Sequence, residues 1–332
     1  MINQYTRVLA LAGILMLAGC ATGLPQGGER ASRPEDVGFS SERLQKLTTR
    51  LTEGAARGEY PGGVLIIGRQ GKIVLQQSFG LRDPATGAAM QDDAIFRIAS
   101  MTKPMASLAV MMLAEEGKLS IVDPVSKYLP ELKDMKVGVM KAGADGKTTL
   151  TLEDQRQPMT VQDLLRHTSG LPSGDASGNL IKRMYFDAKI GNRSLTSQQY
   201  IDALAKLPLL YQPGTTWEYG ASVDVLGVIV ERVSGMPLDR FFRERIFTPL
   251  KMNDTAFEVA DAKWPRMALV YTPDGAGGVR EDGGGVAATA EGGVEDDLAV
   301  ARVQDRQHFV QHHADMGDGH AASPRARAAR AR

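Results

Sequence analysis

Two strand-like segments followed by a series of helices limit the folds open to this chain. Residues 63–69 and 72–79 are rich in apolar and β-branched residues and flank Gln70-Gly71, which predicts a hairpin. Helical periodicities dominate the middle of the chain, and no strands alternate with them. Because a parallel sheet needs repeated strand–helix–strand units, this order predicts an α+β fold and argues against a doubly wound sheet.

Caps and apolar stripes predict the helices. Ser40 is a candidate N-cap for a helix that runs to about Arg57, and Thr160 with Asp163 resembles a capping box. Residues 222–234 are apolar nearly all round, which predicts a core helix. Further helices are expected at 104–116, 161–166 and 197–206.

Charge and cysteine content exclude several classes of function. The 332 residues include 39 Lys plus Arg and 39 Asp plus Glu, so the formal net charge is zero. Nucleic-acid binding needs a surplus of positive charge, so nucleic acid is not an expected partner. With one cysteine the chain can form neither an intramolecular disulfide nor a thiolate zinc cluster. There is no HExxH or GxSxG motif, and no cofactor or metal is expected.

The N-terminal segment is typical of an exported lipoprotein. Arg7 precedes an apolar run over 8–17 that is too short to span a bilayer of about 30 Å, as in a secretory signal. The run ends in Leu-Ala-Gly-Cys20, which resembles the lipobox of bacterial lipoproteins, whose cysteine is lipidated. We therefore expect a signal peptide over 1–19, a lipid anchor on Cys20 and a tether over 20–35. The alternative is an ordinary signal peptide with an incidental cysteine.

This segment also predicts a location. The protein would be exported across the inner membrane into the periplasm. Ala21 rather than Asp follows Cys20, so the usual signal for retention in the inner membrane is absent. We expect the lipid to anchor the protein to the outer membrane.

Ser100-Met101-Thr102-Lys103 is the first candidate for chemistry. A serine at the start of the 104–116 helix lies in the positive field of unpaired N–H groups, and a spacing of three places Lys103 on the same face. An amine there can accept the proton of the serine hydroxyl, as in the S-x-x-K motif of acyl-transfer enzymes. On spacing alone, an N-capping serine beside a solvated lysine is the other interpretation.

Several ordered motifs give the tetrad a context. The segment 96–104 (FRIASMTKP) resembles the nucleophile segment of the serine β-lactamase and penicillin-binding protein superfamily. It is most similar to the class C β-lactamase branch, which includes family VIII carboxylesterases and nylon-oligomer hydrolases. The other matching segments are 164–171 (LLRHTSGL), 217–219 (WEY), 224–227 (DVLG), 235–238 (GMPL) and 249–255 (PLKMNDT). The resemblance covers about 36–285.

The resemblance implies a β-lactamase-like fold, an antiparallel sheet flanked by helices plus a helical lobe. It also implies that Ser100 is the nucleophile of an acyl-enzyme, that Lys103 activates it or shuttles its proton, and that Tyr219 is a second base or acid. The backbone N–H of Ser100 would form half of an oxyanion hole. Without the resemblance, Tyr219 could be a half-buried aromatic beside Trp217. His167 lies in a helix-ending turn, which favours a structural role.

The chain departs from the family pattern at two places. The family's β-lactamases carry Y-x-N, but here the triplet is Tyr219-Gly220-Ala221, and Ser222 would point elsewhere on its helix. The third motif (K-T-G, H-T-G or W-x-G) is absent after Tyr219. The first departure favours ester or small amide substrates over β-lactams, with a D-alanyl-D-alanine peptidase as the next relative. The second leaves open a catalytically inactive binding or scaffold lipoprotein.

The composition changes after about residue 285. From Glu281 onward there are twelve Ala among 52 residues and one aromatic, Phe309. We expect an incomplete hydrolase domain over 36–285 that lacks its C-terminal strands, followed by a low-complexity tail over 286–332 without structure. A shifted reading frame or a truncated relative would explain this change. Loss of the late strands would expose an edge of the 63–79 hairpin and predicts poor solubility.

Overall fold

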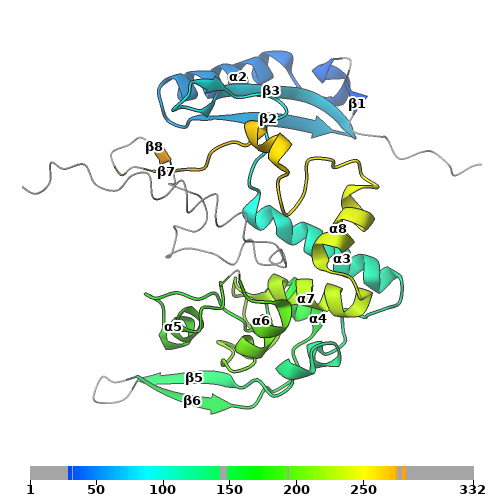
Figure 1. Cartoon of the computed structure of the whole chain (residues 1–332), viewed down its shortest axis with the longest axis vertical. Helices are drawn as coiled ribbons and strands as arrows, with labels where there is room; N and C mark the ends of the chain where they lie inside the picture. The colour runs from blue at the N-terminus through cyan, green and yellow to red at the C-terminus, as the bar shows by residue number, and fades with distance from the viewer. Residues whose placement is uncertain are drawn as a thin grey trace, which may run out of the picture. The chain divides into compact units, whose positions relative to one another are not determined.

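The computed structural model describes residues 29–31, 33–142, 148–192, 194–273, 275 and 279–281 (Figure 1). The chain divides into two compact units, Met1–Ala94 and Ile95–Arg332, and each is described by itself. Cys20, the predicted signal peptide and the predicted tail over 286–332 lie outside the described residues, as does most of the predicted tether. Among the described residues, no helix combines the length and the apolar character that a membrane span requires.

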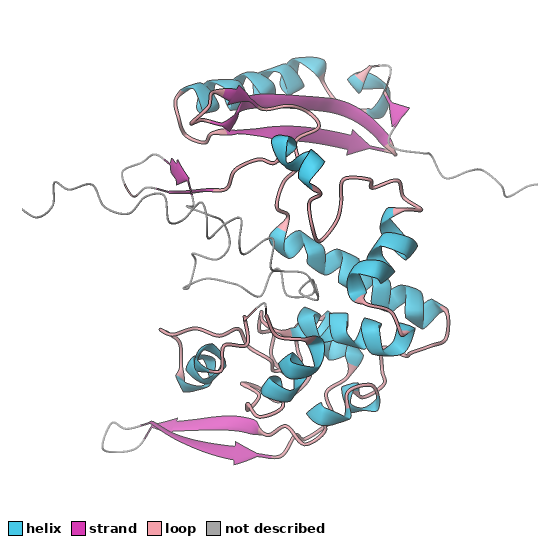
Figure 2. Ribbon diagram, viewed as in Figure 1, coloured by secondary structure: helices cyan, strands magenta, loops and turns pink. Residues whose placement is uncertain are grey.

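The first unit is a small sheet with one long helix. Its elements are β1 (Glu29–Arg30), α2 (Ser41–Ala56), β2 (Gly62–Arg69), β3 (Lys72–Asp83) and β4 (Ala88–Ala89). The strand order is β1-β3-β2, with β4 paired to β3, and α2 lies along the sheet (Figure 2). The two residues between β2 and β3, Gln70 and Gly71, both have positive φ, as a tight two-residue hairpin turn requires. The predicted hairpin is therefore confirmed.

The predicted cap of α2 is confirmed as well. The Ser40 side chain accepts a hydrogen bond of 3.2 Å from the backbone N–H of Arg43. On the sheet, no residue of β2 or β3 is fully buried, and Ile66 is 57 % exposed. β2 lies at the edge of the sheet among the described strands.

The second unit is mainly helical. Its helices are α3 (Lys103–Glu115), α4 (Val161–Leu165), α5 (Leu180–Asp187), α6 (Ser197–Leu204), α7 (Ser222–Ser234) and α8 (Leu238–Phe242). Two antiparallel pairs accompany them, β5 (Val137–Ala142) with β6 (Thr148–Glu153) and β7 (Tyr271–Pro273) with β8 (Val279–Glu281). The first unit also has a short 3-10 helix at Pro34–Val37. In the second unit, short 3-10 helices lie at Ala99–Thr102, Val125–Lys127, Pro130–Leu132 and Asp261–Arg266, and a π-helix at Arg243–Phe247. This mixture of helices and antiparallel strands confirms the predicted α+β class.

The predicted helices of this unit are present, with ends that differ by one or two residues. The capping box of α4 is formed, since Thr160 Oγ1 accepts from the backbone N–H of Asp163 and the Asp163 carboxylate accepts from the backbone N–H of Thr160. The strands β5 and β6 and the helix α5 were not predicted. β6 has the sequence Thr-Thr-Leu-Thr-Leu-Glu, in which polar and apolar residues alternate. The alternation covers only a few residues, so it was overlooked among the longer helical patterns around it.

Helix α7 is the centre of the core. Every residue from Ser222 to Val230 is buried, and Val225, Leu226 and Ile229 have no exposed surface. The helix packs against α3 and α4. The prediction of a core helix at 222–234 is confirmed, and α3 and α7 are the two elements that bring the candidate chemical groups together.

Candidate active site

Ser100 lies in a 3-10 turn that leads directly into α3. The turn spans Ala99–Thr102 and the α-helix begins at Lys103, one residue before the predicted start, so Ser100 lies in the turn and not in the first turn of the α-helix. Side chains three residues apart eclipse each other in a 3-10 turn, which places Lys103 over Ser100. Ala99 has φ +42, a conformation that non-glycine residues rarely adopt. Strain of this kind persists only where the surroundings fix the backbone.

The three predicted catalytic side chains meet at one point. Ser100 Oγ lies 2.8 Å from Tyr219 Oη, and Lys103 Nζ donates to Ser100 Oγ over 3.4 Å. Lys103 Nζ also lies 4.8 Å from the centroid of the Tyr219 ring. All three residues are half-buried. A hydroxyl nucleophile with two basic groups in contact is an arrangement that can transfer an acyl group.

A close approach of two chain segments fixes the position of Tyr219. A Cβ on the next residue, Gly220, would lie 2.3 Å from the backbone carbon of Pro172 and 2.5 Å from the backbone nitrogen of Ser173. Only glycine fits there without moving backbone. The segment that carries Tyr219 is thereby held against the loop that follows α4.

A hydrogen-bonded ladder joins the same two segments. The backbone oxygens of His167, Thr168 and Gly170 accept hydrogen bonds of 2.8 Å from the backbone N–H groups of Glu218, Gly214 and Leu210, in that order. The turn that the sequence placed at the end of α4 therefore has the structural role predicted for it. It supports the strand-like segment that ends at Tyr219.

An ion pair joins the segment that carries Tyr219 to helix α5. Lys182 Nζ of α5 lies 2.7 Å from Glu218 Oε1, and the two side chains are only 25 % and 15 % exposed. Sequence reasoning did not find this pair, because α5 was not predicted and the partners are 36 residues apart in the chain. Glu218 is adjacent to Tyr219, so the pair also constrains the phenol.

His167 has a second role that its sequence context did not reveal. Its imidazole stacks on the Tyr219 ring, with 5.1 Å between ring centroids and 23° between planes. The Trp217 ring completes a cluster, 6.1 Å from the imidazole and 6.4 Å from the Tyr219 ring. Trp217 is 64 % exposed and Tyr219 contacts the Ser100 hydroxyl, so the cluster extends from the protein surface to that hydroxyl.

The residue at the position of the asparagine in the family's Y-x-N triplet is apolar and buried. Ala221, which occupies it, is 1 % exposed. Ser222 is fully buried, and its hydroxyl hydrogen-bonds to Ser169 Oγ at 2.8 Å. The prediction that Ser222 points elsewhere is confirmed, and its hydroxyl does not replace the missing amide.

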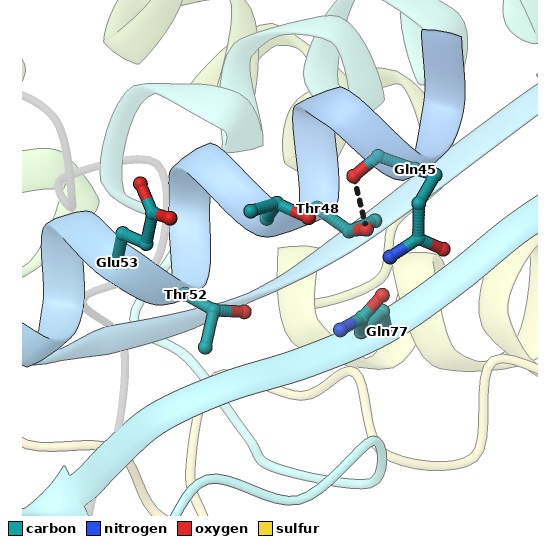
Figure 3. Close-up of a pocket in the computed structure, with 6 residues that line it drawn as sticks. Gln45, Thr48, Thr52, Glu53 and Gln77 are labelled. Atoms are coloured by element: carbon teal, nitrogen blue, oxygen red, sulfur yellow. Dashed lines mark hydrogen bonds between the residues drawn. The ribbon is translucent and has the colours of Figure 1, made fainter. Parts of the chain in front are cut away.

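The first unit has a surface hollow of a different character. Five uncharged polar residues and Glu53 line a space of about 270 Å³ between α2 and β3, shown in Figure 3. Thr48 Oγ1 in this lining donates to the backbone oxygen of Gln45 over 3.0 Å. The lining has no nucleophile with a base beside it. Across the part of the chain that the structure describes, no group of three or more His, Cys, Asp or Glu side chains could hold a metal ion.

Comparison with known sequences and structures identifies the family of the chain. The sequence model of the family described as beta-lactamase matches residues 47–325. The chain belongs to the beta-lactamase family. This confirms the superfamily resemblance and the β-lactamase-like fold class. The match ends beyond residue 285, where the domain was predicted to end, and that boundary stays a prediction.

Individual relatives include an esterase. Protein Rv1367c of Mycobacterium tuberculosis is 37 % identical over 232 residues, which cover 70 % of this chain and 56 % of that protein. Esterase EstB of Burkholderia gladioli is 34 % identical over 212 residues, 63 % of this chain and 50 % of the esterase. The structure of EstCE1, a hydrolase with promiscuous acyltransferase activity, matches with a TM-score of 0.60 and 28 % identity, over 78 % of this chain and 68 % of its own.

The chain spans about half the length of the curated relatives it matches. Two of these relatives have a named activity, one as an esterase and the other as a hydrolase.

Proposed function

We propose that this protein is a serine hydrolase that acts through an acyl-enzyme on Ser100, with ester or small amide substrates. The observation that carries the proposal is the 2.8 Å contact between Ser100 Oγ and Tyr219 Oη, with Lys103 Nζ 3.4 Å from the same oxygen. A serine hydroxyl is a weak nucleophile, and an adjacent general base is the usual means of activating it.

In the first step, Tyr219 acts in its phenolate form, and its Oη accepts the proton of the Ser100 hydroxyl while Oγ attacks the substrate carbonyl carbon. The carbonyl oxygen becomes an oxyanion that the backbone N–H of Ser100 can stabilise. Collapse of this intermediate breaks the bond to the alcohol or amine, which leaves with the proton held by Tyr219. Water then attacks the acyl-enzyme, its proton passes through Tyr219 to Ser100 Oγ, and the acid is released. The positive charge of Lys103 offsets the negative charge that develops between the two oxygens.

The preference for esters or small amides over β-lactams rests on Ala221. A buried methyl group offers no hydrogen bond to the acylamino side chain of a β-lactam, and the hydroxyl of the next residue, Ser222, is already bonded to Ser169. The similarity to an esterase and to a hydrolase with acyltransferase activity supports the same preference.

Covalent labelling tests the acyl-enzyme. The purified chain is incubated with a fluorophosphonate probe and, separately, with a fluorescent penicillin. We expect one labelled residue, Ser100, and no labelling of Ser100→Ala. Ser120→Ala is the matched control, because Ser120 is exposed and its side chain makes no hydrogen bond among the described residues. Folded protein that neither probe labels would instead support the inactive binding or scaffold lipoprotein.

Turnover separates the substrate classes. We expect hydrolysis of short-chain p-nitrophenyl esters, loss of that activity in Tyr219→Phe, and no hydrolysis of a chromogenic cephalosporin. Faster turnover of the cephalosporin than of the esters would contradict the preference for esters. Release of D-alanine from a D-alanyl-D-alanine peptide would point to the peptidase alternative.

We also propose that the protein is a periplasmic lipoprotein anchored to the outer membrane through Cys20. The lipobox-like sequence that ends at Cys20 supports this location. In a Gram-negative host, the wild type should incorporate labelled palmitate and fractionate with the outer membrane. Cys20→Ser should do neither, and a wild type that is released unlabelled would show an ordinary signal peptide.

A further inference from the structure

The ring of His167 covers the ring that carries the proposed base. The two rings are nearly parallel, at 23°, with centroids 5.1 Å apart. Lys103 Nζ also contacts the Tyr219 ring, 4.8 Å from its centroid, while the phenol oxygen lies 2.8 Å from Ser100 Oγ. The position of the phenol oxygen therefore depends on groups that pack on its ring as well as on its own hydrogen bond.

The backbone fixes where this imidazole can lie. His167 has φ +56, a conformation that is uncommon outside glycine and that Asn, Asp and His adopt more readily than other residues. Its carbonyl oxygen accepts from the backbone N–H of Glu218 over 2.8 Å, next to Tyr219 itself. The chain thus holds an uncommon backbone conformation at the residue whose ring supports the phenol.

The surroundings of the imidazole favour its uncharged form. Nδ1 is buried and has no hydrogen-bond partner among the described residues, so a proton there would be a buried unpaired donor. Burial first, and then the charge of Lys103, hold the pKa of His167 below its usual range. Of the other ionisable groups nearby, Glu218 is paired with Lys182, and Tyr219 presents its ring face to the imidazole.

We propose that the uncharged imidazole of His167 is a positioning residue that holds the Tyr219 phenol in line with Ser100. The inference rests on the proposed acyl transfer and adds a residue to it. Small displacements of a reacting group cost large factors in rate, so a ring that prevents the phenol from tilting raises the rate of acylation. Protonation would bring a second positive charge beside Lys103 and weaken this support.

Two substitutions separate the ring from its charge. His167→Asn suits the backbone conformation but removes the ring, and His167→Phe keeps a ring that cannot be protonated. Thr168→Val is the matched control, because it removes the 2.9 Å hydrogen bond from Thr168 Oγ1 to Asp163 Oδ1 in the same turn without touching the imidazole. The kcat and KM for a p-nitrophenyl ester, and the rate of fluorophosphonate labelling, are measured from pH 5 to pH 8, below each protein's unfolding temperature.

At pH 8 we expect kcat of His167→Asn to fall at least tenfold with KM changed less than twofold, and His167→Phe to stay within threefold of the wild type. The ratio of the wild-type rate to the His167→Phe rate should fall as the pH is lowered, because only the wild type has an imidazole to protonate. Thr168→Val should lower Tm and leave the pH dependence of its rate like that of the wild type.

Two results would overturn the inference. One is a His167→Asn variant within threefold of the wild type in kcat, and the other is a wild-type to variant ratio that is constant with pH. If His167→Phe does not fold, the ratio of the wild-type rate to the His167→Asn rate is measured against pH instead, since asparagine cannot be protonated either. Failure of the proposed function looks different, because then the wild type itself would not be labelled at any pH.

Discussion

The two units of the molecule differ in how they bury their apolar residues. In the unit Ile95–Arg332, a continuous cluster surrounds α7, and many of its members have no exposed surface. In the unit Met1–Ala94, the buried apolar residues among those described are Val37, Leu44 and Met90, none of them fully buried, and most residues of both long strands are half-buried. The helical unit therefore has a core of its own, and Ser100, Lys103 and Tyr219 all belong to that unit.

The strongest test of this difference compares one truncation in each unit. Leu226→Ala leaves a cavity in the middle of α7 and should lower the free energy of unfolding by about 2–5 kcal/mol. Ile66→Ala removes a side chain that is 57 % exposed and should cost less than about 0.5 kcal/mol. Denaturant unfolding measures both. Equal losses would contradict the difference in burial between the two side chains.

At Gly220 we expect a substitution to affect stability less than Leu226→Ala does and to affect the rate of Ser100 labelling more. In Gly220→Ala the added methyl group meets the backbone of Pro172 and Ser173, and the strain should cost about 1–3 kcal/mol. Since the neighbour that moves is Tyr219, fluorophosphonate labelling of Ser100 should slow well beyond what the loss of folded protein explains. Gly68→Ala is the control outside the site, because its φ is not positive and the nearest atom to the new methyl group is the backbone oxygen of Lys72 at 3.4 Å, an ordinary contact distance. Labelling at the wild-type rate in Gly220→Ala would show that the close approach is not needed for activity.

The ion pair beside Tyr219 should matter less. Lys182→Met leaves the largely buried Glu218 carboxylate without its partner and should cost about 1 kcal/mol, between the values for exposed and buried pairs. Lys46→Met breaks an exposed pair with Glu42 in the first unit and should cost almost nothing. Thermal unfolding of both variants measures the difference, and a larger loss for Lys46→Met would reverse the comparison.

The smallest expected effect is an acid-dependent one on the surface of the helical unit. Hydrogen bonds from Lys127 and Tyr128 lower the pKa of Asp123 from 3.8 to about 2. A lowered carboxyl pKa stabilises the fold above the unfolded value and loses this contribution as the pH falls from about 4 towards 2. Asp123→Asn should therefore lower Tm at pH 7, and its Tm should converge with that of the wild type near pH 2. A difference in Tm that is independent of pH would mean that the pair contributes through packing alone.

Local signals in the sequence were sufficient for much of the fold. The Gln70-Gly71 turn, the Ser40 cap and the apolar sequence of α7 predicted their elements because each depends on neighbours in the chain. The strands β5 and β6 were not predicted, since each is stabilised by hydrogen bonds to the other strand and neither has a long periodic pattern of its own. Helix α5 is only eight residues long and escaped for lack of a sustained stripe.

The site shows the same limit. The motif resemblance named Ser100, Lys103 and Tyr219, and the structure places them in contact, although 119 residues separate Ser100 from Tyr219. The imidazole that covers Tyr219 was assigned to a turn, because the sequence gives no sign of which ring lies above it. The one sequence signal at His167 is its position directly after the C-cap of a helix, where the chain commonly takes a positive φ.

The exposed indole at the end of the aromatic cluster gives the protein a built-in optical reporter. The chain has two tryptophans, and Trp217 lies 6.1 Å from the imidazole of His167. Protonated imidazole quenches indole fluorescence by contact, so the emission of a Trp264→Phe protein would follow the charge on His167 as the pH falls. The same emission would respond when a ligand covers Trp217, which makes binding visible without any chromogenic substrate.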